Sequence, residues 1–249
     1  MSLGVNSILE SGAVSVSYFP VVFLQGDSPL EGWEAHCGGP TGSLVESPAA
    51  LGRLARELGI EVSVDEATLS AALAGAAGLA ALPALHVAVH GRSVARPGFA
   101  RTLLQALERR GMAPAQLVLR LLDPDPHTAE LLSARVALRE AGVRIALEVD
   151  KRIYATPHAL VHLAPDLLEL DFNLVRRAAR HGLDDALLAS VSRLSRSAQS
   201  LTVARNLETA EELVMADRHG FSLGHGPLVG DAVTPTAAPS AAPALASAC

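Results

Sequence analysis

Eight short runs rich in Val, Ile and Leu recur along this chain of 249 residues, and stretches with a helical period separate most of them. This alternation predicts an α/β fold, because each helix can return the chain to start a new strand beside the last one. Eight strands favour a closed (β/α)8 TIM-like barrel over an open doubly wound sheet. The strands are predicted at 13–23, 30–35, 84–90, 116–122, 143–149, 167–171, 200–204 and 221–223.

The first strand runs into the second through a short turn at residues 25–29, so we expect these two strands to be antiparallel neighbours. The clearest helices are expected at 97–110, 127–141, 184–198 and 208–219. Gly111 and Gly142 should end the first two of them. Asp65 and Thr209 are the side chains that we expect to cap helix N-termini.

One domain is expected, with the barrel in residues 1–232. Residues 233–249 are rich in Pro, Ala and Ser and offer no core, so a disordered tail is predicted there. The Ala-rich stretch 71–90 has the length of a membrane span, but Pro83 interrupts it and strand-like residues follow. A helix followed by a barrel strand is therefore expected, with no membrane association.

Charge and cysteine content exclude several classes of function. The formal net charge of −6 argues against a polymeric nucleic-acid partner, which needs a basic surface. A small phosphorylated ligand held by a few local cations stays possible. Cys37 and Cys249 form no CxxC pair, so a zinc ribbon or redox motif has no support and a reducing, cytoplasmic location is expected. The N-terminus lacks the basic and apolar regions of a signal peptide.

Function in a barrel lies where the strands end, because the loops to the following helices gather there. A hard cation such as Mg²⁺ needs several converging oxygen ligands. The residues at these ends mix both charges and therefore favour mutual pairing over a metal cage: Glu34, Ala88, Arg120, Glu148, Glu169, Arg205 and His225. No GxSxG, P-loop or HExxH motif occurs, and His225 in GHGP is interpreted as structural rather than catalytic.

Short segments in order match the motifs of one known family. YFP (18–20) occupies the position of the family's Tyr-Gln-Pro motif, and WEAHCGG (33–39) that of Glu-Ala-Leu-Leu-Arg. LHVAVHGRS (85–93) corresponds to the Val-Asn-Leu-Ser strand, and LRLLD (119–123) to Leu-Glu-Ile-Thr-Glu. GVRIALEV is similar to the strand ending in paired aspartates, LELDFNLV to Leu-Lys-Ile-Asp-x-x-Phe-Val, ARNLET to Ala-Glu-Gly-Val-Glu-Thr and LGHGPLVG to the Gln-Gly-Tyr segment. Over residues 8–230 the chain thus resembles the EAL domain, the family of cyclic di-GMP phosphodiesterases, which implies a barrel of EAL type.

The resemblance also implies metal ligands and catalytic positions, and most of them are altered. Glu34 and Glu208 keep the family's residue, and Glu148 is an Asp-to-Glu change. The other changes are Ala88 for a ligating Asn, Arg120 and Arg205 for ligating glutamates, Val149 for the second aspartate, Glu169 for the catalytic lysine and His225 for a Gln. The family's flexible glycine loop is DKRIY (150–154) here. The Mg²⁺ or Mn²⁺ site is therefore expected to be lost, and no metal cofactor is predicted.

An inactive EAL-domain protein that acts in cyclic di-GMP signalling through a protein partner is the function expected first. The alternative is a receptor that binds cyclic di-GMP without cleaving it, using residues among Glu34, Glu148, Asp171, Glu208, Arg120 and Arg205. Against this alternative, Gly38 replaces the family's phosphate-contacting Arg, Phe19 replaces the Gln of the first motif, and few aromatic side chains are available for guanine stacking. An active cyclic di-GMP phosphodiesterase has less support, because the metal site is missing, and a different reaction at the altered barrel mouth is the remaining alternative.

Charge pairing is the expected replacement for the metals. Arg120 and Glu148 end neighbouring strands, and so do Glu169 and Arg205. If each arginine pairs with the adjacent carboxylate, the charges nearly cancel without a cation. The alternative is that these side chains extend into solvent with little coupling.

Overall fold

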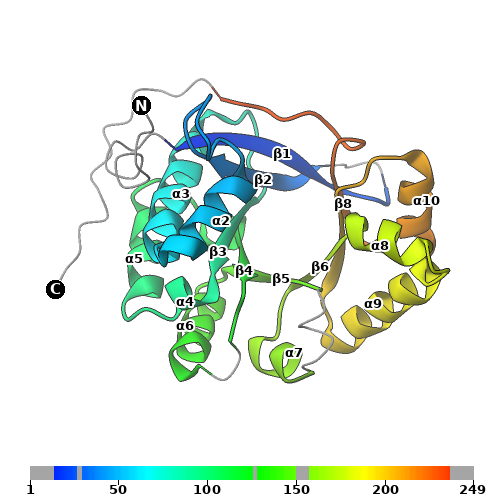
Figure 1. Ribbon diagram of the computed structural model, residues 1–249. Helices are drawn as coiled ribbons and strands as arrows, with labels where there is room; N and C mark the ends of the chain where they lie inside the picture. Colours follow the sequence, from blue (N-terminus) through cyan, green and yellow to red (C-terminus); the bar gives the residue numbers. More distant parts are fainter. Residues whose placement is uncertain (1–13, 27–29, 126–127, 150–156, 236–249) are drawn as a thin grey trace.

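The computed structural model describes residues 14–26, 30–125, 128–149 and 157–235, and eight strands within them close into a barrel (Figure 1). The predicted α/β barrel and all eight predicted strands are confirmed, with ends that differ by a few residues. The strands are β1 Ser15–Phe23, β2 Leu30–Gly38, β3 Leu85–His90, β4 Leu117–Leu122, β5 Arg144–Glu148, β6 Leu167–Asp171, β7 Leu201–Arg205 and β8 Leu223–His225.

The direction of the strands follows the prediction. β1 is antiparallel to both of its neighbours, β2 and β8. The successive pairs from β2 to β8 are parallel. The carboxyl ends of β2 to β8 therefore meet at one end of the barrel, which we call the mouth.

Helices surround the barrel on the outside (Figure 1). They are α2 Pro48–Leu58, α3 Glu61–Gly75, α4 Gly91–Val94, α5 Phe99–Glu108, α6 Ala129–Glu140, α7 Pro157–Leu163, α8 Phe172–Ala179, α9 Asp184–Ala198 and α10 Ala210–Arg218. The four helices predicted from the sequence correspond to α5, α6, α9 and α10. Thr209 caps α10 as expected, in a capping box with Glu212.

Two features of the structure differ from the sequence-based prediction: α2 was not predicted, and α3 begins before its predicted start. Ser47 caps α2 and Gly59, with a φ of 67°, ends it, so both boundary signals were present. α3 begins at Glu61, and Asp65 is buried one turn inside it. The carboxylate of Asp65 accepts hydrogen bonds from the backbone N–H of His90 and from the Ser93 hydroxyl, so it fixes the end of β3 rather than capping a helix.

Strand alternation builds two apolar layers. On each strand, alternate side chains point outward and pack under the helices. The intervening side chains fill the barrel with an apolar ring: Val21, Ala84, Val118, Ala146, Leu167, Val203 and Leu223. Because side chains on a strand repeat every two residues, the next inward positions toward the mouth are Arg120, Glu148, Glu169, Arg205 and His225.

The stretch 71–90 contains the end of α3, a 3-10 turn at Ala76–Gly78 and β3, as predicted. None of the helices in the described ranges has the length and apolar character needed to cross a membrane.

The beginning of the predicted tail contacts the barrel. Val233 and Tyr18 exchange two backbone hydrogen bonds of 2.8 Å. Pro235 lies against Gly78, because a Cβ added to Gly78 would come within 2.8 Å of the Pro235 Cβ. Residues 233–235 therefore continue the folded structure, contrary to the expectation of disorder from residue 233, while residues 236–249 lie outside the described ranges.

Candidate functional site at the barrel mouth

The mouth carries a layer of ionisable side chains directly above the apolar ring. We call it the mouth cluster; its members are Glu34 and His36 of β2, Arg120 of β4, Glu148 of β5, Glu169 of β6, Arg205 of β7 and His225 of β8. The structure therefore brings together most of the charged positions that the sequence singled out at strand ends.

Glu34 lies at the centre of the mouth cluster, and its side chain is 4% exposed. Arg205 Nη2 donates a hydrogen bond to Glu34 Oε1. Arg120 Nη2 donates a second one to the same oxygen over 3.3 Å, and His36 Nε2 lies 3.1 Å from it. On the other side, His225 Nε2 lies 3.6 Å from Glu34 Oε2. One carboxylate thus contacts two guanidinium groups and two imidazoles.

Two further carboxylates contact the same arginines. Glu169 Oε2 lies 3.2 Å from Arg205 Nε and 3.7 Å from Arg120 Nε. Glu148 Oε2 lies 3.5 Å from Arg120 Nη1. Both expected pairs are present, and each arginine also reaches Glu34. The alternative of side chains extended into solvent is wrong for Arg205, whose side chain is 8% exposed.

Burial and the two arginines set the protonation of the cluster. Burial opposes ionisation of Glu34, but the charges of Arg205 and Arg120 outweigh it and hold the pKa of this carboxyl well below its usual range. Burial raises the pKa of the Glu169 carboxyl, although both arginines oppose that shift. Burial also disfavours the charged form of Arg205, but the neighbouring carboxylates outweigh it and raise the guanidinium pKa. The strongest full ion pair of the cluster is therefore Glu34 with Arg205.

His225 behaves differently from the charged groups around it. Burial is the main reason why the pKa of His225 falls to about 4. Its imidazole is consequently neutral at pH 7, and neither ring nitrogen has a hydrogen-bond partner within the described residues. The sequence-based view of His225 as a structural residue is compatible with this burial, although its unpaired nitrogens are unusual for a core histidine.

His36 is the member of the cluster that sequence reasoning missed. It lies two residues after Glu34 on β2, so alternation alone places both side chains on the same face. Its ring centroid lies 4.5 Å from that of Phe19 and 5.4 Å from that of His225. These three rings cover one side of Glu34, where the family resemblance places a Gln at each of the positions of Phe19 and His225.

Two of the predicted positions lie beside the cluster without a charged contact. Val149 is buried in the apolar core, and its N–H donates to the backbone oxygen of Glu169 over 2.7 Å. Ala88 lines the cleft described below. Residues 150–154, the predicted glycine-free loop, lie outside the described ranges.

Two other predicted positions, Asp171 and Glu208, make contacts with the outer helix α8. Asp171 accepts a hydrogen bond from the Asn173 N–H over 2.8 Å and thereby caps α8. Glu208 is exposed and pairs with Arg176 at 3.1 Å. Asp171 also accepts a hydrogen bond from Asn206 Nδ2 over 2.9 Å, and Asn206 lines the cleft described below.

The donor set of the mouth does not fit the two divalent cations that the resemblance implies. Glu34, His36 and His225 offer ligand atoms within 4.8 Å of one another, and such donors suit transition metals in principle. Glu34 Oε1, however, is already hydrogen-bonded to Arg205 and Arg120. A metal cation at ~4 Å from one guanidinium group is repelled by several kcal/mol of electrostatic energy at an effective dielectric constant near 20. Mg²⁺ and Mn²⁺ also prefer oxygen ligands, and the other carboxylates of the cluster contact arginines as well.

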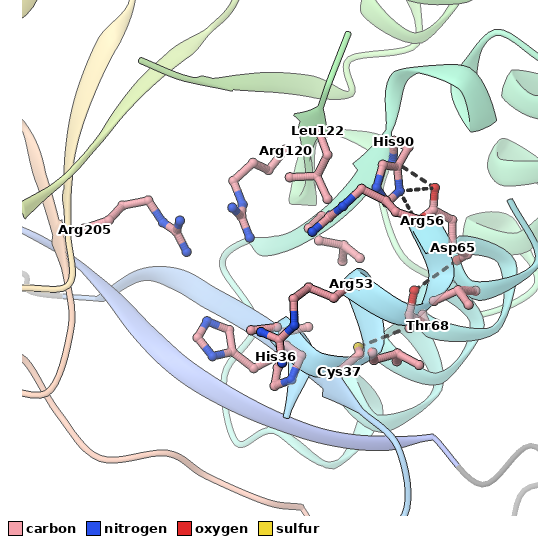
Figure 2. A pocket seen from close by; sticks show the side chains of 18 of the residues that line it. His36, Cys37, Arg53, Arg56, Asp65, Thr68, His90, Arg120, Leu122 and Arg205 are labelled. Atoms are coloured by element: carbon pink, nitrogen blue, oxygen red, sulfur yellow. Dashed lines mark hydrogen bonds and ion pairs between the residues drawn. The ribbon is translucent and has the colours of Figure 1, made fainter. Parts of the chain in front are cut away.

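A cleft of about 600 Å³ opens beside the cluster, between α2, α3 and the ends of β2, β3, β4 and β7 (Figure 2). Its floor is mostly apolar, and several cationic side chains face it. The residues that line it include Cys37, Leu51, Arg53, Arg56, Val64, Asp65, Ala88, His90, Arg120, Leu122 and Arg205.

The family follows from a direct comparison. The family model described as "EAL domain" matches residues 5–232, and the chain belongs to this family. It is 26% identical over 190 residues to "Cyclic di-GMP phosphodiesterase PdeF" of Escherichia coli (strain K12). That match covers 74% of this chain and 25% of the relative, so the chain corresponds to about a quarter of that protein.

Solved structures support the same fold. The PaMucR phosphodiesterase in complex with c-di-GMP superimposes with a TM-score of 0.79 at 22% identity, covering 93% of this chain and 96% of that one. The EAL domain of FimX from Xanthomonas citri, in complex with c-diGMP, gives a TM-score of 0.76 at 20% identity, covering 92% and 91%. At these identities the likeness establishes the barrel and leaves the chemistry to the residues of the mouth.

Proposed function

We propose that this chain is a catalytically inactive EAL-domain protein that acts in cyclic di-GMP signalling through contacts with a protein partner. The observation that carries the proposal is the sharing of Glu34 Oε1 by the guanidinium groups of Arg205 and Arg120. By resemblance, both arginines stand at positions where the family has metal-ligating glutamates. Their positive charges occupy the surroundings of Glu34 that a divalent cation would need.

The side chains that would activate water and stabilise the negative charge on the phosphate are also missing from the mouth cluster. Metal-assisted phosphodiester cleavage needs a cation to activate water and to stabilise the charge on the phosphate. Glu169 stands at the position of the catalytic lysine, and burial raises its carboxyl pKa, so it supplies no positive charge there. Val149, at the second aspartate position, has no ligand atom in its side chain. No described member of the cluster replaces these roles.

The direct test is hydrolysis of cyclic di-GMP. The purified chain is incubated with cyclic di-GMP and Mg²⁺ or Mn²⁺, and products are separated by chromatography beside an active EAL-domain phosphodiesterase. We expect no linear product above the level of buffer alone. Product that forms in proportion to protein, and that Glu34→Ala abolishes, would contradict the proposal.

The signalling part of the proposal needs a test in cells. Expression of the chain in a bacterium that responds to cyclic di-GMP should change the response without lowering the cellular concentration of the nucleotide. The Glu34→Ala variant should have the same effect if it folds, because no catalysis is involved. A fall in nucleotide concentration that depends on Glu34 would instead indicate hydrolysis.

A non-hydrolysing receptor for cyclic di-GMP is the second candidate, and the cationic cleft beside the mouth favours it. Against it stands Gly38, where the family has a phosphate-contacting Arg. A Cβ on Gly38 would lie 1.8 Å from the backbone oxygen of Glu46, so the backbone here leaves no room for a side chain. Titration calorimetry with cyclic di-GMP, with and without Mg²⁺, separates the candidates: saturable binding supports the receptor, and no heat at high concentration supports the protein-contact role.

A further inference from the structure

The cleft beside the mouth has more positive than negative charge. Four arginines line it, Arg53 and Arg56 of α2 with Arg120 and Arg205 of the mouth cluster. Asp65 is the carboxylate among the lining residues. In a chain whose formal net charge is −6, this local excess of cations does not follow from composition.

The single carboxylate does not neutralise the cleft, because Asp65 is already occupied. Its oxygens accept hydrogen bonds from the backbone N–H of His90 over 2.8 Å and from the Ser93 hydroxyl. His90 Nδ1 also lies 3.0 Å from Asp65 Oδ1. The dashed lines of Figure 2 show the contacts between His90 and Asp65 at the edge of the cleft. The Asp65 carboxylate therefore holds the end of β3 and the start of α4, and its oxygens are not directed at the arginines.

The four arginines divide into two pairs with different partners. Arg120 and Arg205 are compensated by the carboxylates of the mouth cluster. Within the described residues, Arg53 and Arg56 form no hydrogen bond or ion pair, and both are exposed. Figure 2 shows the side chains of both turned toward the same space as Arg120.

Local helix structure does not account for both unpaired arginines. Residues three apart share a face of an α-helix, so Arg53 and Arg56 repel one another across one turn. Arg56 lies in the last turn of α2, where a cation favours the helix dipole. Arg53 lies in the middle of the helix, where this explanation does not hold. A pair of like charges facing a cleft is relieved by an anion bound between them.

The walls of the cleft indicate the size and kind of anion. A volume of about 600 Å³ is within the range of small-molecule sites. Among the residues that line it, the aromatic rings are the imidazoles of His36 and His90, and the larger Phe, Tyr or Trp rings that stack on purine bases are lacking there. The favourable contacts available are charge-assisted hydrogen bonds from guanidinium groups, which suit phosphate geometry.

We propose that Arg53 and Arg56 form a binding site for a small phosphorylated ligand, recognised by a compact group with two or more negative charges rather than by a base. The proposal goes beyond the loss of hydrolysis. It depends on the proposed loss of hydrolysis in one respect: a phosphate ester bound in the cleft would be released without being cleaved. Arg120 and Arg205 form the far wall and contribute to the positive potential.

Inorganic pyrophosphate is the probe, used on the full chain at constant ionic strength and without divalent cations. Binding is measured by calorimetry and by the shift of the thermal midpoint. We expect saturable binding in the millimolar range or tighter. The Arg53→Gln/Arg56→Gln double variant should bind at least about tenfold more weakly, because two charge-assisted contacts are lost. The matched control is Arg101→Gln/Arg109→Gln, which removes the same charge from exposed positions of α5 and its end and should bind like the natural chain.

Each outcome decides the proposal. Absence of saturable pyrophosphate binding by the natural chain overturns it, and so does equal affinity of the natural chain and the Arg53→Gln/Arg56→Gln variant. The Arg53→Lys/Arg56→Lys variant provides a check on folding and geometry: it keeps both charges, and binding should be intermediate because a lysine lacks the guanidinium fork. None of these measurements involves hydrolysis, so the proposal and the inactive-enzyme proposal can fail separately.

Discussion

Glu34 and Arg205 form a buried ion pair across the barrel mouth, from strands β2 and β7, with side chains 4% and 8% exposed. The carboxylate is one that the family resemblance assigns to a metal, and the arginine replaces another such ligand. The guanidinium group therefore supplies, from the protein itself, positive charge that a cation would otherwise bring to Glu34. Unlike a bound metal ion, the guanidinium group is covalently attached to a strand, and it cannot coordinate and activate a water molecule.

The first prediction concerns the coupling within this pair. Arg205→Met should lower the free energy of unfolding by roughly 3 kcal/mol or more, because the Glu34 carboxylate stays buried without its main partner. The Glu34→Gln/Arg205→Met double variant should lose clearly less than the sum of the two single variants. Urea unfolding of the four proteins measures the coupling. Additive losses would show that the two side chains do not depend on one another.

A control pair lies on the surface. Arg96 and Glu66 form an ion pair between side chains that are 52% and 44% exposed. Such pairs are screened by water and contribute little, so the cycle of Arg96→Met and Glu66→Gln should give a coupling below about 1 kcal/mol.

The second prediction concerns pH. An unfolded histidine has a pKa of about 6.5, whereas burial lowers the pKa of His225 in the folded chain to about 4. Between these values the unfolded chain binds a proton that the folded chain does not. Stability should therefore fall as the pH is lowered from about 6.5 to 4, with a contribution from His225 of about 3 kcal/mol. Urea unfolding at a series of pH values measures this slope.

The variant His225→Gln should flatten the slope in this window, because its side chain does not titrate. The control variant His181→Gln changes an exposed histidine and should leave the slope as it is. An unchanged slope in His225→Gln would mean that His225 takes up its proton in the folded chain as readily as in the unfolded one.

The barrel could be predicted because local signals specify its parts. Eight apolar runs of strand length, glycines such as Gly142 after helices, and the Thr209 cap are all readable from short windows. α2 was not predicted, although Ser47 and Gly59 mark its ends and Leu51 and Ala55 give it a buried apolar face, so its signals were as readable as those of the predicted helices. Asp65 was misassigned because a carboxylate before a helix-like run resembles a cap, while its actual partners, His90 and Ser93, lie more than 20 positions away.

The candidate site was predictable only in part for a similar reason. Contacts between adjacent strands, such as Arg120 with Glu148, follow from chain order in a parallel barrel. The contact of Glu34 with Arg205 joins residues 171 positions apart across the barrel, and strand order alone does not show which side chains meet there. His36 could have been found by alternation from Glu34. That Arg53 and Arg56 have no partner among the described residues depends on the course of the surrounding chain and had no signal in the sequence.

The third prediction concerns the end of the chain. Truncation after Pro235 should leave the thermal midpoint within about a degree or two, since the removed residues offer no core. Truncation after Asp231 also removes the two Val233 hydrogen bonds to Tyr18. It should therefore lower the free energy of unfolding by about 1–3 kcal/mol. Thermal and urea unfolding of both truncated chains test this, and equal stability of the two would show that the Val233 pairing contributes nothing.

The fourth prediction compares two glycines under the same substitution. Gly38→Ala should lower the free energy of unfolding by roughly 2 kcal/mol or more, because its Cβ would lie 1.8 Å from a backbone oxygen that must move. Gly52→Ala should raise it by about 0.5–1 kcal/mol, because Gly52 lies inside α2 and its Cβ would meet its nearest neighbour at an ordinary 3.8 Å. Opposite signs in urea unfolding would confirm the comparison, and a neutral Gly38→Ala would contradict it.

The last prediction follows from the same close approach and concerns binding. By resemblance, Gly38 stands where the family contacts a phosphate of cyclic di-GMP with an arginine, so Gly38→Arg restores the family's residue type. We expect it not to restore binding, because the side chain can be accommodated only if the backbone near Glu46 shifts away from β2. The variant should have a lower thermal midpoint than the natural chain and show no gain in calorimetric heat with cyclic di-GMP. A variant of unchanged stability that binds cyclic di-GMP more tightly would show that the segment after β2 yields easily, and that the receptor role was lost through this single substitution.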